Sequence, residues 1–144
     1  MSKTYIPSSL SINNKKKQKN YIKKSKKLYK QNKYFIRPKI KNFKSKTSKH
    51  IIKAYKLYNI KSMKPSKILE RKTGCTIKGL NAIIKKGSGA YYSSGSRPNQ
   101  TAQSWAYARL ASAITGGNSS KVDYHILEKE CDKNSLALKL AKKN

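Results

Sequence analysis

The side chains in this chain that are best able to do chemistry are lysines, and the chemistry is phosphate binding. The 144 residues include 35 Lys and Arg against 5 Asp and Glu, a formal net charge of +30. The first 64 residues hold 21 of these basic residues and no acidic one, so internal ion pairs cannot neutralise them. We therefore expect a polyanionic partner, of which nucleic acid is the commonest. A solvated tail that only keeps the protein soluble is the alternative, although solubility needs a net charge of only about 2–8.

The basic residues are nearly all Lys, which binds phosphate as a point charge without the planar two-bond geometry of Arg. This composition predicts contacts that do not depend on nucleotide sequence. The candidate contact residues come from the N-terminal segment, with one arginine from a later loop. They are Lys15, Lys16, Lys17, Lys19, Lys23, Lys24, Lys26, Lys27, Arg37, Lys39, Lys41, Lys44, Lys46 and Arg97.

The loop Ser93–Gln100 is a second candidate anion site. Its hydroxyl and amide side chains and Arg97 stand just before an expected helix N-terminus, where free N–H groups and the helix dipole attract anions. This arrangement predicts a phosphate or carboxylate cradle. The alternative is that Arg97 and the hydroxyls satisfy buried backbone groups of their own loop. The loop is not a Walker loop, because no Gly-Lys-Ser/Thr follows its glycines.

Catalytic residues are not evident, and we expect a non-catalytic protein. His125 has only Asp123 and Glu128 as close acidic neighbours, and surface pairing on one helix explains that spacing. The serines of the Ser93–Gln100 loop have no evident base to activate them.

Cys75 and Cys131 are far apart and lack C-x-x-C spacing. Even with His50 and His125 they show no zinc-ligand pattern, so we expect no metal, no cofactor, and two thiols packed as small apolar groups. The sequence shows neither an apolar run of about 20 residues nor a signal peptide. We therefore expect a chain without a membrane span that is made in the cytosol and is not secreted.

The periodicity predicts an all-α fold with a small multi-helix domain over residues 46–144 and a basic arm over residues 1–45 that becomes ordered on a partner. Residues 1–12 are expected to be an extended leader. Ser11 can cap a helix through residues 13–34, with a thin stripe of apolar residues that leaves it frayed without a partner. Residues 34–48 alternate apolar and basic side chains around Pro38, which predicts an extended strap.

Residues 46–86 are predicted to form a helical hairpin. One helix runs from Ser48 to about Asn59, and a short one over residues 66–72 ends at Gly74. Another helix follows, with Thr76 as its N-cap. A short helix, a turn and a helix also outline a helix-turn-helix, so a plain hairpin and a DNA-groove reader both remain open.

Residues 87–117 change to small residues, and their glycines and Pro98 predict a loop over residues 87–100. Thr101 caps a predicted helix over residues 102–115, Ser119 or Ser120 caps one over residues 122–131, and a last helix follows over residues 134–143. The expected structural residues of this region are Gly89, Tyr91, Pro98, Trp105 and Arg109.

Arg109 and the pair Tyr91–Tyr92 have alternative interpretations. Arg109 lies one helical turn after Trp105 and could stack on its indole, but an ion pair, for example to Asp123, is the commoner role. The pair Tyr91–Tyr92 could stack on bases, although we expect one or both rings to fill the core beneath the glycine loop.

The string GSGAYYSSGSRPNQTAQSWAYARLASAITGG resembles a family of small proteins, with no assigned activity, encoded by nucleocytoplasmic large DNA viruses and algal viruses. Its Gly-Ala-aromatic, Arg-Pro-Asn and Trp-Ala-x-Ala-Arg elements are more loosely similar to segments of tailed-phage head proteins. The strings YIPSSLS, KKKQ, RPKIKNFKSKTSKH and KTGC also look like the viral family, so the resemblance covers nearly the whole chain. It implies a viral origin, with a location in the virion and, during infection, in the host cytoplasm or viral factory. No residue inherits a catalytic role.

Together these features predict a virion protein that binds genome phosphate without reading sequence. The alternative is a minor capsid or cement protein whose basic arm binds acidic capsid subunits, and a helix-turn-helix regulator comes third. The sequence leaves open whether the partner is DNA, RNA or protein, whether the location is shell or genome core, and which oligomeric state forms.

Overall fold

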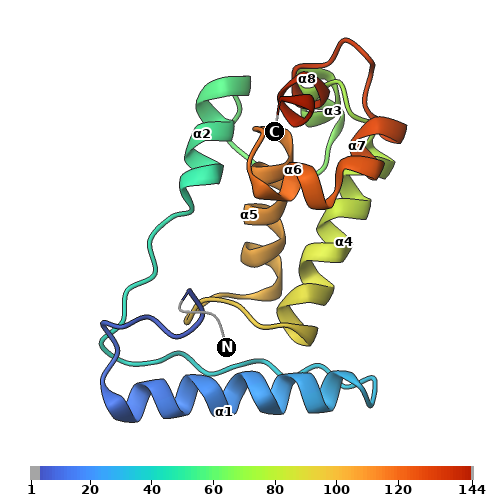
Figure 1. Cartoon of the computed structure of the whole chain (residues 1–144). Coiled ribbons are helices and arrows are strands. Elements are labelled where there is room, and N and C mark those ends of the chain that lie inside the picture. The colour runs from blue at the N-terminus through green and yellow to red at the C-terminus, as the bar shows by residue number, and fades with distance from the viewer. Residues whose placement is uncertain (1–3, 144) are drawn as a thin grey trace. The chain divides into compact units, whose positions relative to one another are not determined.

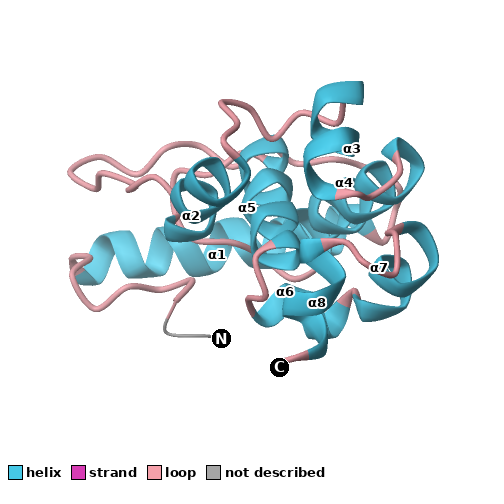
Figure 2. Cartoon of the chain, turned by 90° about the horizontal axis from the view of Figure 1, so that it is seen from above, coloured by secondary structure: helices cyan, strands magenta, loops and turns pink. Residues whose placement is uncertain are grey.

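The computed structural model describes residues 4–143 and confirms the all-α class. Among these residues there are eight helices and no strand, only an isolated β-bridge (Figure 2). None of these helices is long and apolar enough to cross a membrane. The helices are α1 (Ile12–Tyr29), α2 (Lys49–Tyr58), α3 (Lys67–Thr73), α4 (Ile77–Ser93), α5 (Ala102–Ile114), α6 (Asn118–Val122), α7 (Tyr124–Glu130) and α8 (Leu136–Lys142) (Figure 1).

The chain forms two compact units, and each combines two separate segments. The first unit joins the chain up to Lys46 with Ser88–Trp105, and the second joins Thr47–Gly87 with the chain from Ala106 onward. We expected an arm over residues 1–45 and one domain over residues 46–144. In the structure Ser88–Trp105 groups with the N-terminal segment, and its backbone and hydroxyl groups bind side chains of that segment.

Ser11 is the N-cap of α1, as predicted, and its hydroxyl accepts the N–H of Asn14. It ends at Tyr29 instead of reaching residue 34, and its buried side chains are Gln18, Ile22 and Ser25. The following segment is extended and runs back along α1 (Figure 1), where the amide of Asn14 donates to the carbonyl of Lys41 over 3.2 Å. This confirms the extended strap. Residues 4–10 of the expected leader fold into turns that bury Leu10, while residues 1–3 lie outside the described residues.

α2 and α3 begin and end close to the predicted positions. The hydroxyls of Ser48 and Ser66 cap the two helices, and α3 ends at Gly74 in the left-handed region. Thr76 caps α4, since its hydroxyl accepts the N–H of Gly79.

α4 corrects the prediction of a loop over residues 87–100, because the helix continues through Gly87 and Gly89 to Ser93. The glycine at 87 serves a close approach and not a turn. A Cβ placed on Gly87 would lie 2.7 Å from the Cα of Ala106, so only glycine lets the two backbones come this near. The loop itself is confined to residues 94–101.

The C-terminal region contains one helix more than expected. α5 is capped by Thr101, as predicted, and α8 by Ser135. The single helix predicted over residues 122–131 is instead divided at Asp123 into α6 and α7, and Val122 is 62 % exposed. Asp123 at the break has a non-helical backbone conformation (φ −102°, ψ 17°), and its buried carboxylate binds an arginine of α5.

The apolar core lies in the second unit, where α2, α3, α5, α7 and α8 contribute Ala54, Leu69, Leu110, Leu127 and Leu138. α6, α7 and α8 pack on one another. The prediction of two free thiols is wrong, because Cys75 and Cys131 form a disulfide within this core. The N–H of Thr76 donates to the carbonyl of Glu130, and that of Asp132 to the carbonyl of Gly74, so backbone hydrogen bonds flank the bridge. The two cysteines are 56 residues apart, so the sequence alone did not indicate that they pair in the folded protein.

We expect loss of the disulfide to destabilise the second unit. The bridge joins cysteines 56 residues apart, and a loop of this length corresponds to about 4 kcal/mol in the chain-entropy description. Urea unfolding of a Cys75→Ser/Cys131→Ser variant should show that loss, and dithiothreitol should reduce the stability of the unsubstituted protein alone. Equal urea midpoints for the oxidised and reduced protein would contradict a structural disulfide.

Two of the three glycines of α4, Gly87 and Gly89, should respond differently to alanine. Gly87→Ala places its Cβ against the Ala106 backbone and should lower the free energy of unfolding by about 1–3 kcal/mol. Gly89→Ala meets only the Tyr29 hydroxyl at 3.4 Å and should leave stability unchanged or raise it by up to about 1 kcal/mol through helix propensity. Thermal unfolding followed by circular dichroism compares the two. Equal effects would show that the close approach does not limit position 87.

Candidate functional site

Four exposed lysines form a row along α1. Lys16, Lys19, Lys23 and Lys27 are spaced by three or four residues and therefore lie on one face of the helix, away from its buried side chains. We call these four residues the lysine row. At a rise of 1.5 Å per residue the row extends over about 16 Å. Lys17 and Lys24 are exposed beside it, whereas Lys15 and Lys26 are half-buried.

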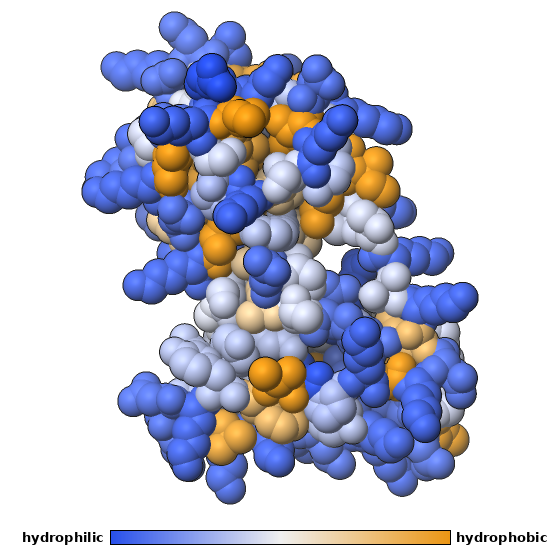
Figure 3. Space-filling model, turned by 180° about the vertical axis from the view of Figure 1, so that it is seen from behind, coloured by the Kyte–Doolittle hydropathy of each residue, from blue (hydrophilic) through white to orange (hydrophobic). Residues whose placement is uncertain are grey.

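The first unit, to which the row belongs, contains no acidic residue. Its two segments together hold 17 Lys and Arg and no Asp or Glu, so all five acids of the chain lie in the second unit. Lys39, Lys41, Lys44 and Lys46 in the extended segment are also exposed. In the space-filling view hydrophilic side chains cover most of the face shown, with small hydrophobic patches between them (Figure 3). The positive potential of the first unit is therefore not reduced by any carboxylate of its own.

Arg37 is the exception among the predicted contact residues, because it is buried inside the first unit. Its guanidinium donates to the Ser25 hydroxyl (3.1 Å), the Tyr91 carbonyl (2.7 Å) and the Ser96 hydroxyl (2.6 Å). It also lies 3.7 Å from the centre of the Tyr91 ring. Burial lowers the pKa of this guanidinium, since no carboxylate compensates for the lost water. The expectation that Arg37 contacts a partner is thus corrected: it joins α1, the extended segment and the end of α4.

Two amide side chains complete this interior. Gln18 donates to the carbonyls of Tyr5 and Ser96, each over 3.1 Å. Asn99 accepts the N–H of Ile40 (2.6 Å) and donates to the carbonyls of Ile40 and Phe43. Sequence reasoning missed Gln18 and considered Asn99 only as part of the candidate anion cradle. The signal for Gln18 was available, because the positions in the lysine run that are not lysine include 18, 22 and 25, which form the buried face.

The Ser93–Gln100 loop directs several of its polar groups inward. Ser96 binds Arg37, Asn99 holds the extended segment, and the Gln100 carbonyl accepts the Tyr91 hydroxyl. They agree only in part with the alternative that Arg97 and the hydroxyls satisfy buried backbone groups of the loop: the Ser96 hydroxyl does so by donating to the Arg97 carbonyl. Arg97, by contrast, is exposed, as are Ser93 and Ser94. Anion binding by Arg97 remains a prediction.

The residues predicted to be structural around this loop are Gly89, Tyr91, Pro98 and Trp105. Tyr91 and Pro98 are buried, and a Cβ placed on Gly89 would lie 3.4 Å from the Tyr29 hydroxyl. The Trp105 ring meets Tyr5 edge-on, with ring centroids 5.8 Å apart.

Arg109 is engaged by a carboxylate in the second unit. Its Nε and Nη2 donate to the two oxygens of the buried Asp123 over 2.9 and 2.7 Å, and this bond raises the pKa of the guanidinium. The nitrogen of Lys86 lies 4.0 Å from the same carboxylate. Arg109 thus has the structural role that its spacing favoured.

The helix-turn-helix outline is present in α3 and α4, but its geometry does not favour phosphate. The carboxylate of Glu70 accepts the N–H of Ile77 at the start of α4, and that of Glu130 accepts the Thr76 hydroxyl. The α4 N-terminus, the end that reads bases in such motifs, is therefore occupied by two acids and by the disulfide.

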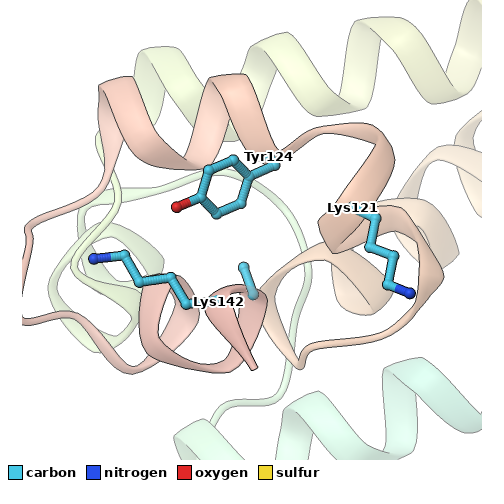
Figure 4. A pocket seen from close by; sticks show the side chains of 4 residues that line it. Lys121, Tyr124 and Lys142 are labelled. Atoms are coloured by element: carbon cyan, nitrogen blue, oxygen red, sulfur yellow. The ribbon is translucent and has the colours of Figure 1, made fainter. Parts of the chain in front are cut away.

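A shallow, open depression in the second unit is lined by Lys121, Tyr124, Ala141 and Lys142 (Figure 4). Both lysines are exposed, so the depression offers an anion little that other surface lysines lack. No group of three or more His, Cys, Asp or Glu side chains within residues 4–143 could hold a metal ion.

Residues 7–134 match the model of a family of unknown function, DUF5824. Because the match covers most of the chain, the chain belongs to this family. No curated protein and no solved structure matches the chain. The family match supports a relationship over nearly the whole chain, and it carries no link to large DNA viruses or to phage head proteins.

Alanine substitutions of Arg37 and Arg97 compare a buried arginine with an exposed one. Both arginines belong to the first unit, and each substitution removes one positive charge. Arg37→Ala leaves buried oxygens without a donor and should lower the free energy of unfolding by about 2–4 kcal/mol. Arg37→Lys should recover little, because an ammonium lacks the fork that spans these acceptors. Arg97→Ala, at an exposed position, should change stability by less than about 0.5 kcal/mol. Urea titrations that give the two alanine variants the same stability would contradict the structural role of Arg37.

Proposed function

We propose that this member of DUF5824 binds nucleic acid through Lys–phosphate contacts that do not depend on sequence, centred on the lysine row of α1. The observation that supports this most is a folded unit with 17 basic and no acidic residues, whose main helix presents a continuous face of lysines. A protein that needs charge only for solubility mixes both signs on its surface.

The spacing of the row suits a phosphate backbone. One strand of a duplex carries a phosphate about every 3.4 Å along the helix axis, so the 16 Å row is as long as about five phosphates. Lysine ammonium groups bind such oxygens without selecting a base, and release of counterions drives the association. The row contains no arginine for two-bond recognition of guanine, which supports binding without sequence preference.

An acidic protein surface, such as that of a capsid subunit, is the second candidate, since the same charges attract carboxylates. A location in a virus particle belongs to the proposal only through the resemblance of residues 87–117 to viral proteins. Detection of the protein in purified particles, in the shell or with the genome, tests that location separately from binding.

The lysine row should determine the salt dependence of binding. A variant with Lys16, Lys19, Lys23 and Lys27 changed to Gln should bind duplex DNA more weakly. Its slope of log affinity against log salt should be smaller by about 3–4, or about 0.9 per lost contact. Gln and Lys have similar helix propensities, so α1 should remain folded. Fluorescence anisotropy with a labelled duplex of arbitrary sequence gives both quantities.

A matched control removes four exposed lysines from the second unit, Lys53, Lys56, Lys61 and Lys64, and reaches the same net charge. We expect this control to keep most of the slope. Equal slopes for the two variants would mean that net charge, and not the row, controls binding. Tighter binding to polyglutamate than to DNA at physiological salt would instead support the acidic-protein partner and refute the proposal.

A further inference from the structure

Next to α1, the extended segment of the first unit exposes two large apolar side chains. Tyr34 is 68 % exposed and Ile36 is 81 % exposed, whereas Phe35 is half-buried and Arg37 is buried. This alternation is expected for extended backbone, in which successive side chains point to opposite sides. Tyr34 and Ile36 therefore share the outer side of the segment. Most of the surface of these two side chains remains exposed to solvent.

Tyr34 is held in place although it is exposed. Its ring centroid lies 5.0 Å from that of Tyr92 and 6.0 Å from that of Tyr29, and the rings of Tyr29 and Tyr92 stack with centroids 5.9 Å apart. We call Tyr29, Tyr34 and Tyr92 the tyrosine cluster. An aromatic side chain already ordered by its neighbours loses little conformational entropy when a ligand binds to it.

The surroundings of the tyrosine cluster are basic. Lys30 and Lys33 are exposed on either side of the turn that connects Tyr29 to Tyr34. On the inner side of the segment the ammonium of Lys24 lies 4.7 Å from the centre of the Phe35 ring. Because the whole unit lacks acids, a ligand for this surface has to offer negative charge together with flat apolar groups.

From this combination we infer that Tyr34, supported by the tyrosine cluster and with Ile36 beside it, is a base-stacking site for single-stranded nucleic acid. The inference rests on the proposed function and adds the form of the ligand to it. Bases of a duplex already stack on one another, so an exposed ring contributes to binding only where bases are unpaired. A hydrophobic protein partner would use Tyr34 and Ile36 equally well but would gain nothing from the acid-free surroundings.

The test compares a twelve-residue oligothymidylate with an abasic deoxyribose-phosphate oligomer of the same length and charge, and with duplex DNA. The unsubstituted protein should bind the oligothymidylate at least about fivefold more tightly than the abasic oligomer. Tyr34→Ala should remove most of that difference and leave binding to the abasic oligomer and the duplex unchanged. Tyr34→Phe should keep it, since the ring is retained. Ile68→Ala, at an exposed isoleucine of the second unit, serves as the control.

Each outcome separates this inference from the proposed function. Failure to bind any of the three polymers at low salt would refute both. Binding of the abasic oligomer as tightly as the oligothymidylate would refute base stacking alone and leave the phosphate contacts intact. An equal loss for all three polymers in Tyr34→Ala would also refute stacking, because it would show a general effect on the unit. Circular dichroism of each variant shows that α1 remains folded.

Discussion

The first unit depends on a positive charge that is buried without a negative one. Arg37 binds three neutral oxygens, from Ser25, Tyr91 and Ser96, and through them connects α1, the extended segment and the end of α4. A carboxylate would be the usual partner of a buried guanidinium, because it compensates for lost hydration. Here hydroxyl and carbonyl dipoles take that role. The unit thereby keeps a folded structure without introducing a single acid into its surface or interior.

This constraint explains the character of the unit's interior. Buried polar side chains, among them Gln18, Ser25 and Ser96, occur there next to few apolar ones such as Ile22 and Ile40. Such a network is stable only when each member finds its partner, and among the described residues no buried side-chain nitrogen or oxygen lacks one. The second unit is built differently, around an apolar core, a disulfide and the Arg109–Asp123 pair. All five acids lie in this second unit, where Asp123 and Glu70 bind groups of the protein itself.

Local chemistry was readable from the sequence, and distant contacts were not. Ser11, Ser48, Thr101 and the turn at Gly74 mark helix ends correctly, because capping involves residues within one turn. Gly87 was predicted to be a loop residue. Glycine is needed there because the backbone of Ala106, which lies far along the chain, comes close to it. The sequence did not predict the Cys75–Cys131 disulfide or the break at Asp123, because both involve contacts with residues elsewhere along the chain. In the candidate site the lysines were evident, whereas the inward turn of Arg37 depends on Tyr91 and Ser96, more than fifty residues away.

The division of the first unit into two distant segments also affects how it folds. The hydrogen bond from Gln18 to Ser96 connects residues 78 apart, with much of the second unit's chain between them. Contacts over such separations form late, because a long loop has to close before they contribute. Until then the lysine segment repels itself, and counterions alone reduce that repulsion. We therefore expect the rate at which this unit assembles to depend on the ionic composition of its surroundings.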